Sequence, residues 1–252
     1  MGMVITMKHT IPLRKNLLTT QNTKTSKGES LGYLTGILYL APSDTVEGIN
    51  LCPFASKGCK AACLFTAGRG KFSNVMNARI KKTIHFRDDI NSFMESLVLS
   101  IENVILEARV KGLKPCIRLN GTSDIRFEYY RDKQGRNIFE NFPRVQFYDY
   151  TKDFHRLAAL KGDKWKNYHL TFSRSESRAN HAQCEKMLDM GVNVAVVYRS
   201  DKDKGHRQLA RKIDGDLHDL RFLDKRSKNN DGYIVALKAK GDAKKDKSGF
   251  VI

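Results

Sequence analysis

The chain has 252 residues, of which 45 are Lys or Arg and 27 are Asp or Glu, so its formal net charge is +18. A hydrophobic share of 40% and a charged share of 29% are typical of a globular protein and exclude an intrinsically disordered one. No apolar run approaches the ~20 residues that cross a bilayer, and the N-terminus lacks a signal peptide, so we expect a cytoplasmic protein without membrane association.

The basic charge favours polyanionic partners, above all nucleic acid. Solubility alone would account for it equally well, since charge by itself does not define a site. The composition does not indicate an oligomeric state.

In chain order, residues 1–33 are predicted to form a polar N-terminal arm, because residues 8–33 are rich in Lys, Thr, Asn and Gly. Residues 34–252 are predicted to form a single α/β domain. Its first strand is predicted in the apolar segment 35–44, with the strand itself ending at Pro42. The domain ends in a Lys-rich tail, for which we expect a solvated and partly disordered conformation.

Three of the five cysteines follow the first strand directly, in the run CPFASKGCKAAC: Cys52, Cys59 and Cys63. In a chain without an export signal, such crowding indicates metal binding or catalysis rather than disulfides. Three thiolates suit an iron–sulfur cluster with one open position or a fourth ligand from elsewhere. A zinc site with His85 as a further ligand is the alternative, although spacings of six and three residues fit zinc knuckles badly.

The next segment, residues 73–111, is predicted to be helical, because apolar residues recur three and four positions apart, with a break between Thr83 and Asp89. Strands and helices then alternate. Strands are predicted at residues 115–120, 144–149, 168–173, 193–199 and 232–239, and helices at 178–190 and 204–213. This order predicts a partial or complete (β/α) barrel with mostly parallel strands, and an open doubly wound sheet is the alternative.

The remaining two cysteines lie on these elements. Cys116, on a strand, is a reserve fourth ligand, and Cys184, on a helix, is expected to be a buried core residue.

Polar side chains stand at the ends of these strands, where parallel α/β folds place their ligands. The candidate ligand-binding residues are Asn120, Ser123, Asp124, Ser173, Arg174, Tyr198 and Arg199. Together with Arg118 they would suit a polar, charged ligand such as a nucleotide-like cofactor.

The cysteine run, the segment NARIKKTIHFRDDINSF and the later RLNGTSDI resemble a phage-encoded family of unassigned function, the gene product 88 family, from about Thr35 to the C-terminus. More distantly, the layout is similar to the radical SAM superfamily, in which a three-cysteine loop after the first barrel strand holds a [4Fe-4S] cluster. That resemblance implies that Cys52, Cys59 and Cys63 are the cluster ligands and that the polar strand ends face S-adenosylmethionine. The chain departs from the superfamily in its cysteine spacing and in lacking a Gly-Gly-Glu-like strand.

We therefore expect a phage iron–sulfur protein with a radical-SAM-like barrel that acts on or binds nucleic acid. Two alternatives stay open. One is a non-enzymatic nucleic-acid-binding module with a structural or redox-sensing cluster, and the other places zinc where the cluster would be.

Overall fold

The computed structural model describes residues 16–21, 23–160, 165–201, 211–225 and 231–252. Within these ranges, eight strands form one sheet in the order β1-β2-β3-β4-β5-β6-β8-β7. The strands are β1 (Leu18–Thr19), β2 (Tyr33–Leu38), β3 (Lys114–Arg118), β4 (Gln146–Thr151), β5 (Tyr168–Ser173), β6 (Val194–Tyr198), β7 (Lys212–Asp214) and β8 (Ile234–Lys238). Only β1 pairs antiparallel to its neighbour; the six other pairings are parallel.

The α-helices of the described ranges are α1 (Thr23–Glu29), α2 (Lys57–Ala61), α3 (Ser73–Asp88), α4 (Ile90–Val110), α5 (Ile138–Asn141), α6 (Phe154–Leu160) and α7 (Arg178–Asp189). Short 3-10 helices complete the fold: η1 (Leu64–Thr66), η2 (Gly68–Lys71), η3 (Phe127–Tyr129), η4 (Arg221–Leu223) and η5 (Gly241–Lys245). None of these helices combines the length and the apolar character that a membrane-spanning segment needs.

The sheet is open, with β1 and β7 as its two edges. The complete barrel allowed by the sequence is therefore wrong. From β2 to β6 the strands lie side by side in chain order, without the central reversal that marks a doubly wound fold; in the described ranges the order reverses at one edge, where β8 lies between β6 and β7. Mostly parallel strands, as predicted, are confirmed, and their carboxyl ends share one edge of the sheet.

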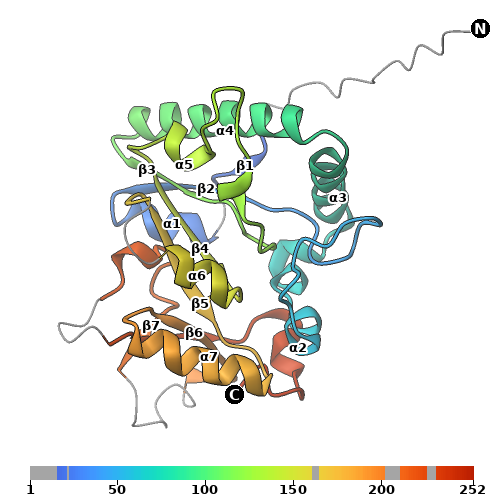
Figure 1. Ribbon diagram of the computed structural model, residues 1–252, viewed down its shortest axis with the longest axis vertical. Helices are drawn as coiled ribbons and strands as arrows, with labels where there is room; N and C mark the ends of the chain where they lie inside the picture. The colour runs from blue at the N-terminus through green and yellow to red at the C-terminus, as the bar shows by residue number, and fades with distance from the viewer. Residues whose placement is uncertain (1–15, 22, 161–164, 202–210, 226–230) are drawn as a thin grey trace, which may run out of the picture.

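The main core lies between the sheet and α4, which runs along the top of the molecule in Figure 1. Phe93, Leu97 and Ile101 of α4 are fully buried at spacings of four, as the periodicity predicts. The predicted break between two helices is confirmed at Asp89, whose side chain accepts a hydrogen bond from the Ser92 N–H and caps α4. A second cluster packs α7 on β5 and β6 through Met187.

Two predictions for the chain ends are corrected. The polar arm is wrong for residues 16–21 and 23–33, which contain β1, α1 and the first residue of β2. Leu17 is buried, and its N–H donates to Ser100 Oγ at 2.9 Å. The rest of the arm lies outside the described residues. The Lys-rich tail is folded, since Phe250 and Val251 are buried and Val251 bridges Val197 of β6. Most of the predicted helix at 204–213 also lies outside the described ranges, and its end forms part of β7.

Candidate functional site

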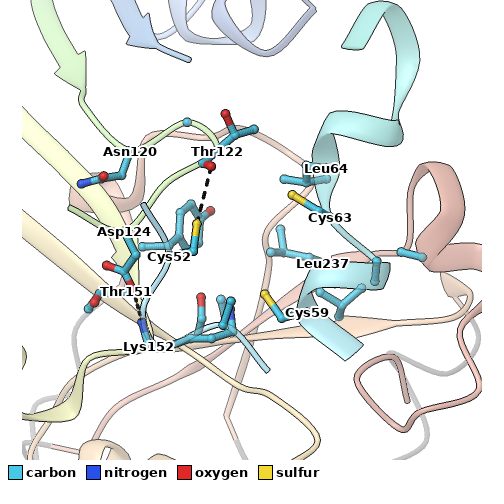
Figure 2. A pocket seen from close by; sticks show the side chains of 18 of the residues that line it. Cys52, Cys59, Cys63, Leu64, Asn120, Thr122, Asp124, Thr151, Lys152 and Leu237 are labelled. Atoms are coloured by element: carbon cyan, nitrogen blue, oxygen red, sulfur yellow. Dashed lines mark hydrogen bonds between the residues drawn. The ribbon is translucent and has the colours of Figure 1, made fainter. Parts of the chain in front are cut away.

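A cavity of about 210 Å³ opens at the carboxyl ends of the strands, beneath the segment that carries the three cysteines. We call residues 52–63 the cysteine segment. Cys52, Cys59 and Cys63 all line this cavity, and Figure 2 shows their sulfur atoms pointing into it from different sides. All three thiols are free and partly buried. The structure thus brings together the three residues that the sequence singles out as ligands.

The cysteine segment is attached to the sheet through Glu176, which follows β5. Its carboxylate accepts hydrogen bonds from the Ser56 hydroxyl at 2.6 Å and from the Gly58 N–H at 2.8 Å. Ser56 Oγ in turn accepts from the Cys59 N–H and caps α2. A Cβ at Gly58 would lie 2.2 Å from Ser248 Oγ and 2.8 Å from Glu176 Oε2, so any larger residue there would displace both side chains.

Cys52 is held on the opposite side of the cavity. Its sulfur accepts from the Ser43 N–H at 3.4 Å and donates to the Thr122 carbonyl at 3.7 Å. Burial raises the pKa of Cys52 to about 12, against the lowering effect of the Ser43 N–H. Burial likewise raises the pKa of Cys63. Without a cation bound to sulfur, these two thiols stay protonated at neutral pH.

Two cationic side chains lie next to the thiols. Lys152, directly after β4, lines the cavity beside Cys59 (Figure 2). Burial alone would lower the pKa of Lys152, but the charges of Cys59 and Asp124 and a hydrogen bond with Cys59 raise it. Arg79 of α3 is 7% exposed, interacts electrostatically with Cys63, and lies 5.0 Å from the centroid of the Tyr39 ring.

The loop after β3 closes another side of the cavity and contains three predicted residues. Asn120 shapes this loop, because its side-chain oxygen accepts from the Ser123 hydroxyl and the Ile125 N–H, both at 2.8 Å. Asp124 accepts from the Lys152 N–H at 2.9 Å and pairs with Arg156 at 3.3 Å. Asn120, Ser123 and Asp124 all line the cavity.

Behind this loop is a buried charge network that sequence reasoning missed. Arg156 bonds both carboxylate oxygens of Glu128 at 2.8 Å and the Tyr168 hydroxyl at 2.6 Å. Tyr168 donates to Asp149, which also accepts from Asn120. Burial raises the pKa of Asp149 to about 6 despite the opposing charge of Arg156. Since the network ends at Asn120 and Asp124, it fixes the loop that borders the cavity.

The four predicted residues on the later strands divide into two groups. Ser173 and Arg174 line the cavity, and Arg174 donates to the carbonyls of Gly249 and Phe250. Tyr198 is buried in the cluster beneath α7 and is not among the residues that line the cavity. Arg199 donates to the Lys244 and Asp246 carbonyls and so holds the C-terminal segment.

Three further candidates lie away from the cavity. Cys116 is fully buried on β3, with its sulfur 3.2 Å from Thr35 Oγ1. His85 is buried against Phe93, and its Nε2 lies 3.1 Å from Ser92 Oγ. Cys184 is buried in the cluster beneath α7, as the sequence predicts. Cys116 and His85 are thus separated from the cysteine segment's thiols, since neither lines the cavity.

The inner part of the cavity contains an ion pair between Arg118 and Asp219 at 2.8 Å. The Arg118 guanidinium also lies 4.7 Å from the centroid of the Tyr150 ring. Tyr150 and Thr151 at the end of β4, and Lys152 directly after it, also line the cavity. Strand alternation separates Tyr198 from Ala195 and Val197, the two β6 residues that line the cavity.

No group of three or more His, Cys, Asp and Glu side chains is arranged to hold a metal ion, as far as the structure describes the chain. The three thiols therefore line one cavity but are not gathered around a single point, as the ligands of one metal ion would be.

Comparisons with known proteins give one match. A search of curated proteins and a search of solved structures return nothing similar to this chain. Neither search supports a link to the radical SAM superfamily. A family model described as Gene product 88 matches residues 15–252, which is nearly the whole sequence. The chain therefore belongs to the gene product 88 family.

Proposed function

We propose that Cys52, Cys59 and Cys63 hold a [4Fe-4S] cluster whose remaining iron faces the cavity. The observation that carries this proposal is the convergence of three free thiols on one cavity with a lysine beside them. Thiolates are the ligands of iron–sulfur clusters, and three of them leave one iron open to a further ligand.

The charge around the thiols supports an anionic centre. Arg79 is almost fully buried, and its Nε and Nη1 have no hydrogen-bond partner among the described residues. Burying a guanidinium is costly unless a negative charge compensates it. The electrostatic partners of Arg79 include Cys63, and those of Lys152 include Cys59 and Cys52. A thiolate-bound cluster would supply the negative charge that Arg79 lacks and would add to that of Asp124 beside Lys152.

The arrangement favours a cluster over a single zinc ion. Zinc holds sulfur at about 2.3 Å, so its ligands must crowd around one point. A zinc ion on the cysteine segment would also need a fourth ligand, and His85, the one offered by the sequence, has its Nε2 3.1 Å from Ser92 Oγ and does not line the cavity. The cavity of about 210 Å³ also exceeds the ~150 Å³ that accommodates a benzene-sized molecule.

We further propose that the open iron and the cavity bind S-adenosylmethionine. When bound, a cluster of this type supplies one electron for cleavage of that cofactor into methionine and a 5′-deoxyadenosyl radical. Support comes from the parallel strands arranged in chain order, as in a partial (β/α) barrel, and from the polar groups of Asn120, Ser173 and Arg118 in the cavity. The second candidate is a binding module in which the same cluster is structural or redox-sensing.

Cysteine variants test the cluster. We expect anaerobically purified protein to be brown, with broad absorbance near about 400 nm. Cys52→Ser, Cys59→Ser and Cys63→Ser should each lose most of this absorbance, while Cys184→Ser, a buried cysteine elsewhere, should keep it. A colourless wild-type protein with stoichiometric zinc would refute the cluster.

A second assay separates the two candidates. The reconstituted protein is reduced with dithionite in the presence of S-adenosylmethionine, and methionine and 5′-deoxyadenosine are quantified. Equal amounts of both products support the enzyme. Their absence, with the cluster intact, supports the binding module.

A further inference from the structure

One outer face of the molecule is strongly basic and is built from two distant parts of the chain. It comprises eight cationic residues, which we call the basic face: Lys57, Lys60, Arg69, Lys71, Lys240, Lys244, Lys245 and Lys247. All eight are exposed. The first four belong to the cysteine segment and the turns after it, and the last four surround η5.

Direct contacts hold these two parts together. The Asp242 N–H donates to Thr66 Oγ1 at 3.1 Å, and Lys71 pairs with Asp242 at 3.5 Å. Beneath the surface, Ala62 packs with Ala243, Phe250 and Val251 in one apolar cluster. In Figure 1, the red C-terminal segment accordingly lies beside α2. The basic face is therefore a fixed part of the fold.

Most of this positive charge is not compensated locally. Lys60 pairs with Asp44, Lys71 with Asp242 and Lys240 with Asp216. For the other five cations, Lys57, Arg69, Lys244, Lys245 and Lys247, the described part of the chain shows no ion pair. A surface with five such cations attracts a polyanion with regularly spaced charges.

The basic face also borders the cavity. Leu64 and Lys240 line the cavity while belonging to the two parts that form the face. Leu64 is 41% exposed, and Phe72, directly after Lys71, is 57% exposed. An exposed aromatic ring among cations is the combination with which proteins bind unpaired bases and the phosphates that join them.

We propose that the basic face binds single-stranded nucleic acid, with phosphates on the cations around η5 and a base stacked on Phe72. A strand bound there lies next to the mouth of the cavity, because Lys240 belongs to the basic face and also lines the cavity. The binding itself goes beyond the proposed cluster, because it uses none of the three cysteines.

Fluorescence anisotropy with a labelled oligothymidylate tests this proposal on the full chain. The triple variant Lys244→Glu, Lys245→Glu, Lys247→Glu should weaken binding at least tenfold and reduce the slope of log K against log salt by about 2, since each phosphate contact contributes about 0.7. The matched control is Arg109→Glu, Lys133→Glu, Arg144→Glu, which removes three exposed cations elsewhere and should leave the affinity within about twofold.

Phe72→Ala should weaken single-strand binding several-fold and leave the salt slope unchanged, because stacking involves no counterion release. Circular dichroism and thermal melting establish that each variant is folded. Equal weakening in both triple variants, no binding by the wild type at low salt, or tighter binding to duplex DNA would each overturn the proposal. The cluster would be unaffected by any of these results, since its test is the absorbance of the cysteine variants.

Discussion

Lys152 is the residue whose charge acts most directly on the proposed centre, because it lies beside Cys59 in the cavity. A unit charge about 4 Å away contributes about 1–4 kcal/mol, depending on solvent screening, which equals about 40–170 mV for one electron. Lys152→Met should therefore make the midpoint potential of the cluster more negative by an amount in this range, measured by redox titration. Lys152→Arg should restore most of the potential.

The control for this change is Lys133→Met, since Lys133 is highly exposed on a turn remote from the cavity. Its potential should equal that of the wild type. A Lys152→Met protein with a normal cluster and an unchanged potential would show that this charge does not act on the centre.

Asp149 predicts a specific pH dependence of stability. Burial raises its pKa from 3.8 to about 6, so between these values the folded protein binds more protons than the unfolded chain. The free energy of unfolding should therefore fall as pH rises through this window, by up to about 3 kcal/mol from this residue.

Asp149→Asn removes the titration and keeps an oxygen to accept from the Asn120 N–H. In urea unfolding at pH 4 and pH 7, the variant should lose less stability than the wild type as pH rises. Identical pH dependence of the two proteins would contradict this assignment.

The sequence predicted site residues that cluster by chemical type, such as the cysteines. It was less reliable for residues whose role depends on the direction of the side chain. The three cysteines stand out because three thiols so close in sequence indicate a shared role, and the structure places all of them at one cavity. Tyr198 and Arg199 also follow a strand, yet the first is buried beneath α7 and the second holds the C-terminal segment. The direction of a side chain at a strand end depends on register and on the next loop, which the sequence does not display.

At the scale of elements, the position of α2 depends on Glu176. Hydrogen bonds to a charged group contribute about 1.5–3 kcal/mol each, so Glu176→Ala, which removes two at a partly exposed carboxylate, should destabilise the cysteine segment by about 3 kcal/mol. We expect faster loss of iron to a chelator and a lower melting temperature. Gly58→Ala should have the same effect, because its Cβ would displace the Glu176 carboxylate.

Glu185→Ala is the matched control, since Glu185 is an exposed glutamate on α7. Its iron retention should match the wild type. If Glu176→Ala also matches the wild type, the carboxylate does not hold the segment.

Elements with strong periodicity were predictable, whereas those stabilised by a few distant contacts were not. The spacing of four residues between Phe93, Leu97 and Ile101 predicts the helix α4. The N-terminal and C-terminal segments are polar overall, so isolated apolar residues such as Leu17 and Phe250 do not stand out. Those residues nevertheless pack into apolar clusters of the fold and order the segments around them.

At the scale of the whole molecule, alternating strands and helices correctly predict a mostly parallel α/β sheet. They do not determine whether the sheet closes, because closure depends on tilt and stagger between strands that the sequence does not encode locally. The open sheet nonetheless gathers the strand ends and the cysteine segment around one cavity, as expected for parallel strands. The folded C-terminal segment then encloses this cavity on a further side through Phe250 and Ala243.

The most direct test of this account is the content of iron and acid-labile sulfide in protein purified without oxygen. A [4Fe-4S] cluster on the three thiols predicts about four iron and about four sulfide per chain, lost together in the Cys59→Ser variant. Protein that contains neither element after anaerobic reconstitution, or that binds zinc alone, would contradict the central claim.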